Sequence, residues 1–158
     1  MPDQNPSTRN NSIYKLRETY FYVIPQYFLI IYLLATGPLI TDNYAFIFLE
    51  IIGFWFLLWV MWTNYFTKFD LSFKPRSNAR LIPKGPYKFI RHPFSSALLL
   101  ISLILILNYI TLARLVAWVA FIVIIFLRVR YEEKIFTSYF NDYKLYKQRT
   151  YNLFPFIY

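Results

Sequence analysis

The sequence contains no cysteine, a single histidine and three glycines among its 158 residues. The missing thiols exclude disulfide frameworks, thiol nucleophiles and cysteine-ligated zinc, and the lone imidazole excludes any site that needs two histidines. Gly37, Gly53 and Gly85 are too dispersed for a P-loop or a dinucleotide-binding fingerprint, because both motifs need clustered glycines. Whatever cofactor the protein uses, it is not held by one of the common soluble nucleotide-binding motifs.

Charged residues are also scarce, and apolar residues take their place. Hydrophobic residues make up 58% of the chain and aromatic residues 23%, whereas Asp, Glu, Lys and Arg together make up 16%. A soluble domain has about 25% charged and about 45–50% apolar residues. The composition therefore predicts an integral membrane protein, and the length predicts a single domain.

Three long apolar runs lie between the charged segments. Residues 20–40 contain no Asp, Glu, Lys, Arg or His, and at about 1.5 Å per residue they can cross a bilayer core about 30 Å thick. This run is too long for the apolar part of a signal peptide, and further apolar runs follow it, so we expect a retained membrane helix. Residues 44–67 form the second run. The third, residues 93–127, is too long for one span and slightly short for two, so we expect a helical hairpin turning near residues 108–111, with a re-entrant hairpin as the alternative.

The basic residues predict the orientation of these spans. Three of the 17 lysines and arginines precede the first run, seven lie between the second and third runs, six follow residue 127, and only Arg114 lies near the other turn. Because Lys and Arg favour the cytoplasmic side, both termini are predicted to be cytoplasmic. The formal net charge of +9 is accordingly assigned to contacts with membrane lipids rather than with nucleic acid.

The sequence thus predicts an all-α fold, in which residues 1–158 form one integral membrane domain with a bundle of four transmembrane helices. We expect a cytoplasmic tail (1–19), two spans (20–67), a cytoplasmic loop (68–91), the helical hairpin (92–128) and a cytoplasmic C-terminal segment (129–158). In this last segment, apolar and aromatic residues recur at helical spacing, which predicts an amphipathic helix that continues the last span. These residues are Ile135, Phe136, Tyr139, Phe140 and Tyr143. A membrane-surface anchor is the simplest role for that helix.

Polar residues gather at the cytoplasmic mouth of the predicted bundle. Arg128 and Glu132 are four residues apart and share a helix face, whereas Glu133 points about 100° away from Glu132, which argues against a paired-carboxylate acid/base site. The hairpin brings residues 91–93, with the only histidine, to the same level, and this convergence predicts a functional site. The simpler interpretation is a snorkelling arginine in an intrahelical ion pair and a histidine that satisfies backbone groups. Glu50, inside the second run, is left outside the site.

Four motifs in the second half of the chain resemble the isoprenylcysteine carboxyl methyltransferase family and its bacterial and archaeal relatives. LIPKGPYKFIRHPFSS at residues 81–96 is similar to the family's GPY…RHP signature, and RVRYEE at residues 128–133 is similar to its arginine followed by a glutamate pair. The family's phenylalanine-glycine, spaced tyrosines and terminal Pro-Phe-Ile are represented by FN at 140–141, by Tyr143 and Tyr146 before Arg149, and by PFI at 155–157. The resemblance covers roughly residues 79–158, and the shared order and spacing make it fairly specific.

The resemblance implies an integral-membrane methyltransferase that uses S-adenosylmethionine and no metal, with the cofactor in a cytoplasmic pocket closed by the C-terminal segment. By position, it implies that Arg128 is the catalytic residue and faces the methyl acceptor. The residues that it implies for cofactor binding are Leu81, Ile82, Tyr87, His92, Pro93 and Glu132. The chain departs from the family pattern at Ser95, Ala97 and Asn141, where the family has tyrosine, glycine and glycine.

The methyl acceptor stays open at this stage. A lipophilic carboxylate, such as that of an isoprenylcysteine, needs no general base and can be gripped by Arg128 through charge-assisted hydrogen bonds. For a phospholipid amine or a thiol a general base becomes useful, and His92 and Glu133 are candidates for it. The alternatives to a methyltransferase are a catalytically degenerate or non-enzymatic membrane protein, which Ser95 favours, and a sterol-type membrane reductase with a nicotinamide cofactor, which has a related RHP segment.

Overall fold

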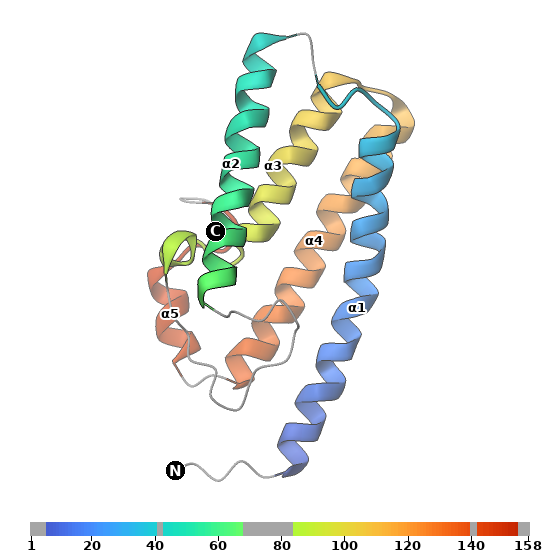
Figure 1. The fold of residues 1–158 in the computed structure, drawn as a ribbon. Coiled ribbons are helices and arrows are strands. Elements are labelled where there is room, and N and C mark those ends of the chain that lie inside the picture. The colour runs from blue at the N-terminus through green and yellow to red at the C-terminus, as the bar shows by residue number, and fades with distance from the viewer. Residues whose placement is uncertain (1–5, 41–42, 68–83, 140–141, 155–158) are drawn as a thin grey trace.

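The computed structural model describes residues 6–40, 43–67, 84–139 and 142–154 (Figure 1). Within these ranges the chain forms five α-helices and one short 3-10 helix, with no β-strand, which confirms the all-α prediction. The elements are α1 (Pro6–Ala35), α2 (Tyr44–Thr67), η1 (Gly85–Lys88), α3 (Pro93–Asn108), α4 (Leu112–Tyr139) and α5 (Tyr143–Arg149).

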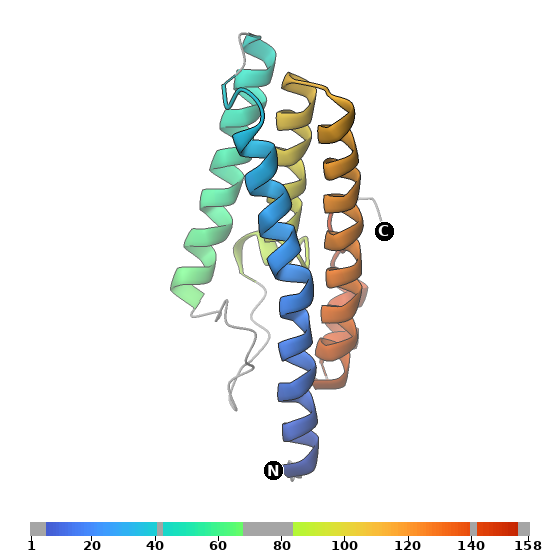
Figure 2. The same cartoon turned by 90° about the vertical axis from the view of Figure 1, so that its right-hand side faces the viewer.

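The four longest helices run side by side as a bundle (Figures 1 and 2). α1 packs mainly against α4 and α2 mainly against α3, while α3 and α4 contact each other as the predicted hairpin. The α1–α2 and α3–α4 connections lie at one end of the bundle, which we call the turn end. η1 and α5 lie toward the other end, where α1 begins, and we call this the mouth (Figure 1).

The predicted and observed boundaries agree for α2 and for the turn of the hairpin, and they differ for the start of α1 and for the end of α4. α2 occupies the predicted residues, and the hairpin turns between Asn108 and Leu112 as expected. α1 begins at Pro6, so the helix extends into the segment predicted as a tail.

The prediction of an amphipathic helix that continues the last span is confirmed as far as Tyr139, where α4 ends, but it is wrong for Tyr143, which begins the separate helix α5. A continuous helix would carry Tyr143 about 10 Å along the axis from Phe136. Instead the chain doubles back, and the two rings pack with their centroids 5.7 Å apart. Burial of the Tyr143 side chain is therefore the physical reason for the break.

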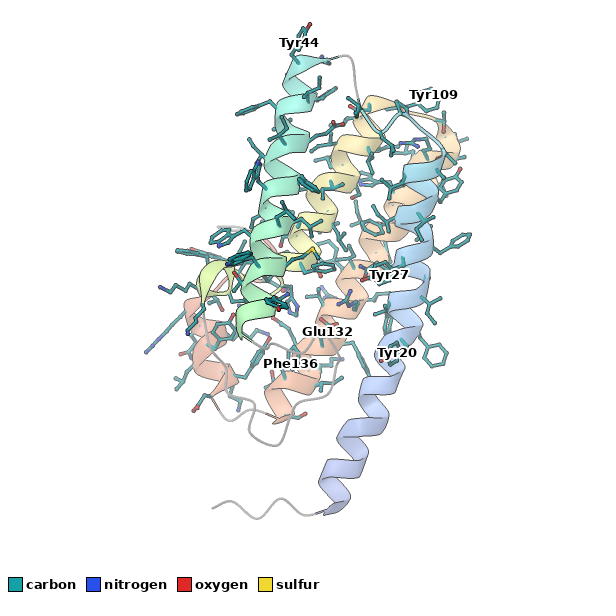
Figure 3. All side chains as sticks on the ribbon, in the orientation of Figure 1. Tyr20, Tyr27, Tyr44, Tyr109, Glu132 and Phe136 are labelled. Carbon is teal, nitrogen blue, oxygen red and sulfur yellow. The ribbon has the colours of Figure 1, made fainter. Side chains whose placement is uncertain are left out.

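Two of the described helices are long and apolar enough to cross a membrane, over Tyr44–Tyr65 and Leu112–Ser138. Only 11% and 22% of their most apolar windows are buried, whereas the core helix of a soluble protein would be mostly buried. The helices over Tyr20–Ala35 and Pro93–Asn108 are apolar but shorter. Large apolar and aromatic side chains project outward along the bundle (Figure 3), as a surface in contact with lipid requires.

A buried arginine ties three helices together at the turn end. Arg114 is 1% exposed, and its Nη1 donates to the Leu33 carbonyl oxygen (2.8 Å), while its Nη2 donates to that of Leu105 (2.5 Å). Its Nε donates to the Tyr109 carbonyl oxygen at 2.8 Å. Carbonyl groups at helix C-termini lack intrahelical donors and carry partial negative charge, so they can compensate this cation. A Cβ on Gly37 would lie 2.5 Å from Arg114 Nη1, so the close approach of the α1–α2 connection requires glycine here.

We expect Arg114→Met to destabilise the bundle, because buried carbonyl groups on three segments lose their donor. A loss of about 2 kcal/mol corresponds to a fall of about 4–8 °C in the unfolding temperature of a chain this size. Thermal unfolding in detergent, followed by circular dichroism, measures the effect. Arg130→Met on the exposed face of the same helix is the matched control and should shift the temperature by less than about 2 °C. Equal shifts in the two variants would contradict the structural role given to Arg114.

Candidate active site

A glycine packs against α2 in residues 84–92, the described part of the connection to α3. Gly85 has a φ of 55°, and a Cβ there would lie 2.6 Å from Thr63 Oγ1, so both the backbone conformation and the space favour glycine. Pro86 then starts η1 from its first turn, which its fixed φ favours. The GPY part of the predicted motif thus shapes a turn that sets Tyr87 against α2.

The segment that follows η1 pairs with the C-terminal segment. Arg91 N donates to the Tyr151 carbonyl oxygen (2.8 Å) and Tyr151 N donates to that of Phe89 (2.8 Å), while His92 N donates to that of Asn152 (3.1 Å). These bonds form an isolated parallel bridge between Ile90 and Tyr151. The RHP residues are therefore held in place by a part of the chain almost sixty residues away.

Glu133 joins α4 to α5 and to the RHP segment. Its Oε1 lies 2.6 Å from Arg91 Nε, and its Oε2 lies 2.8 Å from Lys147 Nζ. Arg91 Nη1 also donates to the carbonyl oxygens of Lys147 (3.1 Å) and Thr150. Arg91 and Glu133 are both buried, and both also contact the C-terminal segment, so this ion pair holds that segment beside α4 at the mouth.

Glu132 is the centre of a second buried network. Its Oε1 accepts from Arg128 Nε at 2.7 Å, and its Oε2 lies 3.4 Å from His92 Nδ1. Arg128 Nη1 in turn donates to Gln26 Oε1 on α1, at 2.7 Å. Figure 3 places Glu132 toward the mouth of the bundle, level with the start of the apolar part of α1. We call this chain of four side chains, from Gln26 through Arg128 and Glu132 to His92, the polar relay.

Three buried tyrosines lie at the same end of the bundle as the relay and stay neutral at ordinary pH. Burial raises the pKa of Tyr87 to about 12, opposed in part by a hydrogen bond with Asn64 and aided by the nearby Glu132 charge. Burial also raises the pKa values of Tyr143 and Tyr146 well above their usual range. The Tyr146 hydroxyl donates to the Tyr87 carbonyl oxygen at 2.7 Å, which links α5 to η1.

Several buried polar atoms at this end have no hydrogen-bond partner among the described residues. They are His92 Nε2 and Gln26 Nε2, at the two ends of the relay, and Asn152 Oδ1 beside the RHP segment. All three residues are at least nine-tenths buried. Since an unsatisfied buried polar group costs about 1–3 kcal/mol, such a cluster is expected where a ligand completes the hydrogen bonds.

The structure brings most of the predicted site residues together. Glu132 contacts both Arg128 and His92, and its charge contributes to the raised pKa of Tyr87. Pro93 is fully buried at the start of α3, which it can begin because it lacks an N–H. Leu81, Ile82 and Asn141 lie outside the described residues, whereas Ser95 and Ala97 are buried in α3. Among the described residues, no cluster of side chains could hold a metal ion.

The prediction missed Gln26, Lys147 and Asn152. Gln26 had a readable signal, because it is the only amide in the apolar run 20–35, and polar residues inside membrane spans are usually functional. Lys147 and Asn152 had none, since their roles depend on how the C-terminal segment folds back.

An open groove of about 650 Å³ lies elsewhere, on the exposed aromatic face of α2. Its lining residues all come from that helix: Trp55, Leu58, Trp59, Met61, Trp62 and Tyr65. No member of the polar relay lines it, so the groove is a surface between projecting rings rather than the candidate site.

We expect Arg91→Met to release the C-terminal segment, because Glu133 loses its buried partner and the carbonyl groups of Lys147 and Thr150 lose a donor. Amide hydrogen exchange of residues 143–152 should accelerate at least about tenfold, while exchange in the middle of α3 stays unchanged. Lys147→Met removes only the half-exposed partner of the same carboxylate and should have a smaller effect. Slow exchange in the Arg91 variant would show that other contacts hold the segment.

The buried tyrosines predict a loss of stability in alkaline solution. Their pKa is near 10 when unfolded and higher when folded, so the unfolded state loses protons first and stability falls as the pH rises above about 10. We expect the unfolding temperature to drop between pH 9 and pH 11.5, and Tyr143→Phe to reduce that drop. The exposed Tyr44→Phe serves as the control and should leave the pH dependence unchanged. An equal pH dependence in all three proteins would contradict the burial of Tyr143.

Comparison with known families agrees with this geometry. Residues 46–138 match the model of the isoprenylcysteine carboxyl methyltransferase family, a range that contains all of α2 except its first two residues, η1, α3, the RHP segment and the Arg128–Glu133 part of α4. No curated protein and no solved structure matches the chain. The family match covers more than half of the chain and includes every member of the polar relay except Gln26. The chain therefore belongs to the isoprenylcysteine carboxyl methyltransferase family.

Proposed function

We propose that this protein is an integral-membrane methyltransferase that moves a methyl group from S-adenosylmethionine to a lipophilic acceptor. The single observation that carries the proposal is the contact between His92 and the Glu132–Arg128 pair, made across the α3–α4 hairpin in a chain of this family. This contact joins the two sequence motifs through which the chain resembles the family. It places an imidazole, a carboxylate and a guanidinium together at the mouth of an apolar bundle.

The four helices of the bundle cross the membrane with both termini on the cytoplasmic side. Two helices are long enough without adjustment, whereas the apolar segments Tyr20–Ala35 and Pro93–Asn108 are about 24 Å long at about 1.5 Å per residue. Local thinning of a bilayer core about 30 Å thick accommodates such segments at modest cost. The basic residues near the mouth then face the cytoplasm, where the soluble methyl donor is found.

The described residues fit the chemistry of S-adenosylmethionine. This molecule has an amino group, a carboxylate, ribose hydroxyls and a positively charged sulfur. His92 Nε2 and Asn152 Oδ1 are buried polar atoms with no hydrogen-bond partner in the ranges that the structure describes, and the Tyr87 ring can face a cation. Glu132 already binds Arg128 and His92, yet each carboxylate oxygen can accept a second hydrogen bond. Leu81 and Ile82 would complete this half of the site, as the family resemblance implies.

S-adenosylmethionine supplies an electrophilic methyl group, so the main task of the protein is to align donor and acceptor in a dry site. Arg91 and Glu133 hold the C-terminal segment at the mouth and thereby exclude water. Glu132 fixes the Arg128 guanidinium, which grips the acceptor. The charged side chains of the two networks are Arg91, Arg128, Lys147, Glu132 and Glu133, three cations and two anions. This excess of positive charge favours an acceptor that carries a carboxylate, and a carboxylate needs no general base.

The acceptor enters sideways from the lipid, between helices of the bundle. Among the described helices, α1 packs closely against α3 and α4 but not against α2. The side between α1 and α2 is therefore the one that can separate at the smallest cost in packing.

Titration of S-adenosylmethionine into the detergent-purified protein tests the proposal. We expect saturable binding that His92→Ala and Glu132→Ala each weaken about tenfold or more, because each removes a buried partner. Arg128→Ala should retain cofactor affinity within about threefold and lower turnover on N-acetyl-S-farnesylcysteine about 100-fold. Glu50→Gln, whose carboxylate accepts from Asn108 Nδ2 at 2.7 Å near the turn end, is the matched control and should leave both properties unchanged.

Two results would contradict the proposal. Absence of saturable binding to the unmodified protein would favour a degenerate, non-enzymatic relative, for which the Ser95 departure already provides a reason. Preferential binding of a reduced nicotinamide would favour the reductase alternative. Intact turnover by Arg128→Ala would leave the methyltransferase in place and remove the role given to Arg128.

A further inference from the structure

The buried amide of Gln26 is the least explained polar group in the bundle. Gln26 lies on α1, on the helix face that also carries the buried Ile30 and Leu33, and its side chain is 0% exposed. An apolar residue at this position would pack against α4 without any polar cost. The family match begins at residue 46, so α1 and its glutamine lie outside the region that the family shares.

The orientation of the Gln26 amide follows from its neighbour. Arg128 has only donors, so the amide must turn its oxygen toward the guanidinium, as the 2.7 Å contact between Arg128 Nη1 and Gln26 Oε1 shows. The Nε2 group then points away from Arg128. It is buried and has no acceptor among the residues that the structure describes. A donor left in this state costs about 1–3 kcal/mol, which a bound oxygen atom would recover.

The position of Gln26 in the polar relay identifies the side of the site that it serves. Arg128 uses Nε to bind Glu132, on the side of His92, and uses Nη1 to bind Gln26. Gln26 therefore lies across Arg128 from the residues that fit the methyl donor. It also lies on the helix that borders the proposed lipid entry. Both facts indicate that the Nε2 group of Gln26 faces the methyl acceptor rather than the cofactor.

From this geometry we propose that Gln26 is a specificity-determining residue, whose Nε2 group donates a hydrogen bond to an oxygen of the acceptor's reacting carboxylate. The inference rests on the proposed function and adds to it a residue from outside the family-matched region. Arg128 supplies charge, while Gln26 supplies a directed donor held by that same arginine. The acceptor's anionic end is thereby selected over a neutral or cationic one.

A pair of substitutions separates the donor from the link to Arg128. Gln26→Glu keeps an oxygen toward Arg128, replaces the Nε2 donor by a second oxygen and adds a negative charge, whereas Gln26→Met removes both groups at similar volume and adds no charge. The exposed Gln148→Glu on α5 makes the same change in charge away from the relay and is the matched control. Circular dichroism and the unfolding temperature show whether each variant retains its fold.

The readout is equilibrium binding, in nanodiscs of a neutral phospholipid, of radiolabelled N-acetyl-S-farnesylcysteine, its uncharged amide and, separately, S-adenosylmethionine. We expect the unmodified protein to bind the acid more tightly than the amide. Gln26→Glu should weaken binding of the acid about 30-fold and Gln26→Met about 3–10-fold, while affinity for S-adenosylmethionine stays within twofold. Gln148→Glu should bind all three ligands as the unmodified protein does.

Two outcomes would overturn the inference. The first is acid binding that stays within twofold in both Gln26 variants, or that never exceeds amide binding in the unmodified protein. The second is a loss of S-adenosylmethionine affinity with acid binding intact, which would assign Gln26 to the cofactor. Failure of the proposed function is recognised separately, because it appears as absent S-adenosylmethionine binding in the unmodified protein, whatever the acid probe shows.

Discussion

The arrangement of the mouth depends on two neighbouring glutamates that a helix forces to point in different directions. Successive residues of an α-helix diverge by about 100°, so Glu132 and Glu133 face different parts of the structure. Glu132 faces into the bundle, where Arg128 and His92 bind it, and Glu133 faces α5, where Arg91 and Lys147 bind it. Glu132 thereby belongs to the polar relay, while Glu133 binds Arg91 and Lys147, which hold the C-terminal segment in place. The two networks are coupled, because Arg91, which binds Glu133, is followed directly in the chain by His92, which contacts Glu132.

The two ends of the bundle hold buried charge in different ways. At the turn end, Arg114 has its cation compensated by carbonyl oxygens of three segments, and this arrangement fixes the helices relative to one another. At the mouth, the charges are paired with carboxylates, yet the relay ends at two atoms, Gln26 Nε2 and His92 Nε2, that have no partner in the described part of the chain. A hydrogen-bond network in which every group has a partner makes the packing of the helices rigid. A network that ends in atoms without partners can bind a ligand through those atoms. The contrast explains why the family motifs cluster at one end only.

Most of the fold could be predicted from the order of apolar and charged residues. α2 and the α3–α4 hairpin begin and end close to where the sequence indicated, because long apolar runs bounded by charge leave few other arrangements. The end of α4 could not be predicted in this way. Helical spacing continues past Tyr139, and only the packing of Tyr143 back onto Phe136 decides that the chain reverses. The spacing of apolar residues along the sequence cannot predict the contact between Tyr143 and Phe136, because this contact forms only once α5 packs back against α4.

By itself, the sequence determined that the chain is helical and apolar, that Arg128 and Glu132 share a face, and that Glu132 and Glu133 diverge. These properties follow from helix geometry and need no distant contact. Only the tertiary structure decided that Glu132 meets His92, that Arg91 holds the backbone of residues 147 and 150, and that Gln26 completes the relay from 102 positions away. The physical reason is that a buried polar group is defined by the partners that surround it, and those partners come from segments that only the folded bundle brings together.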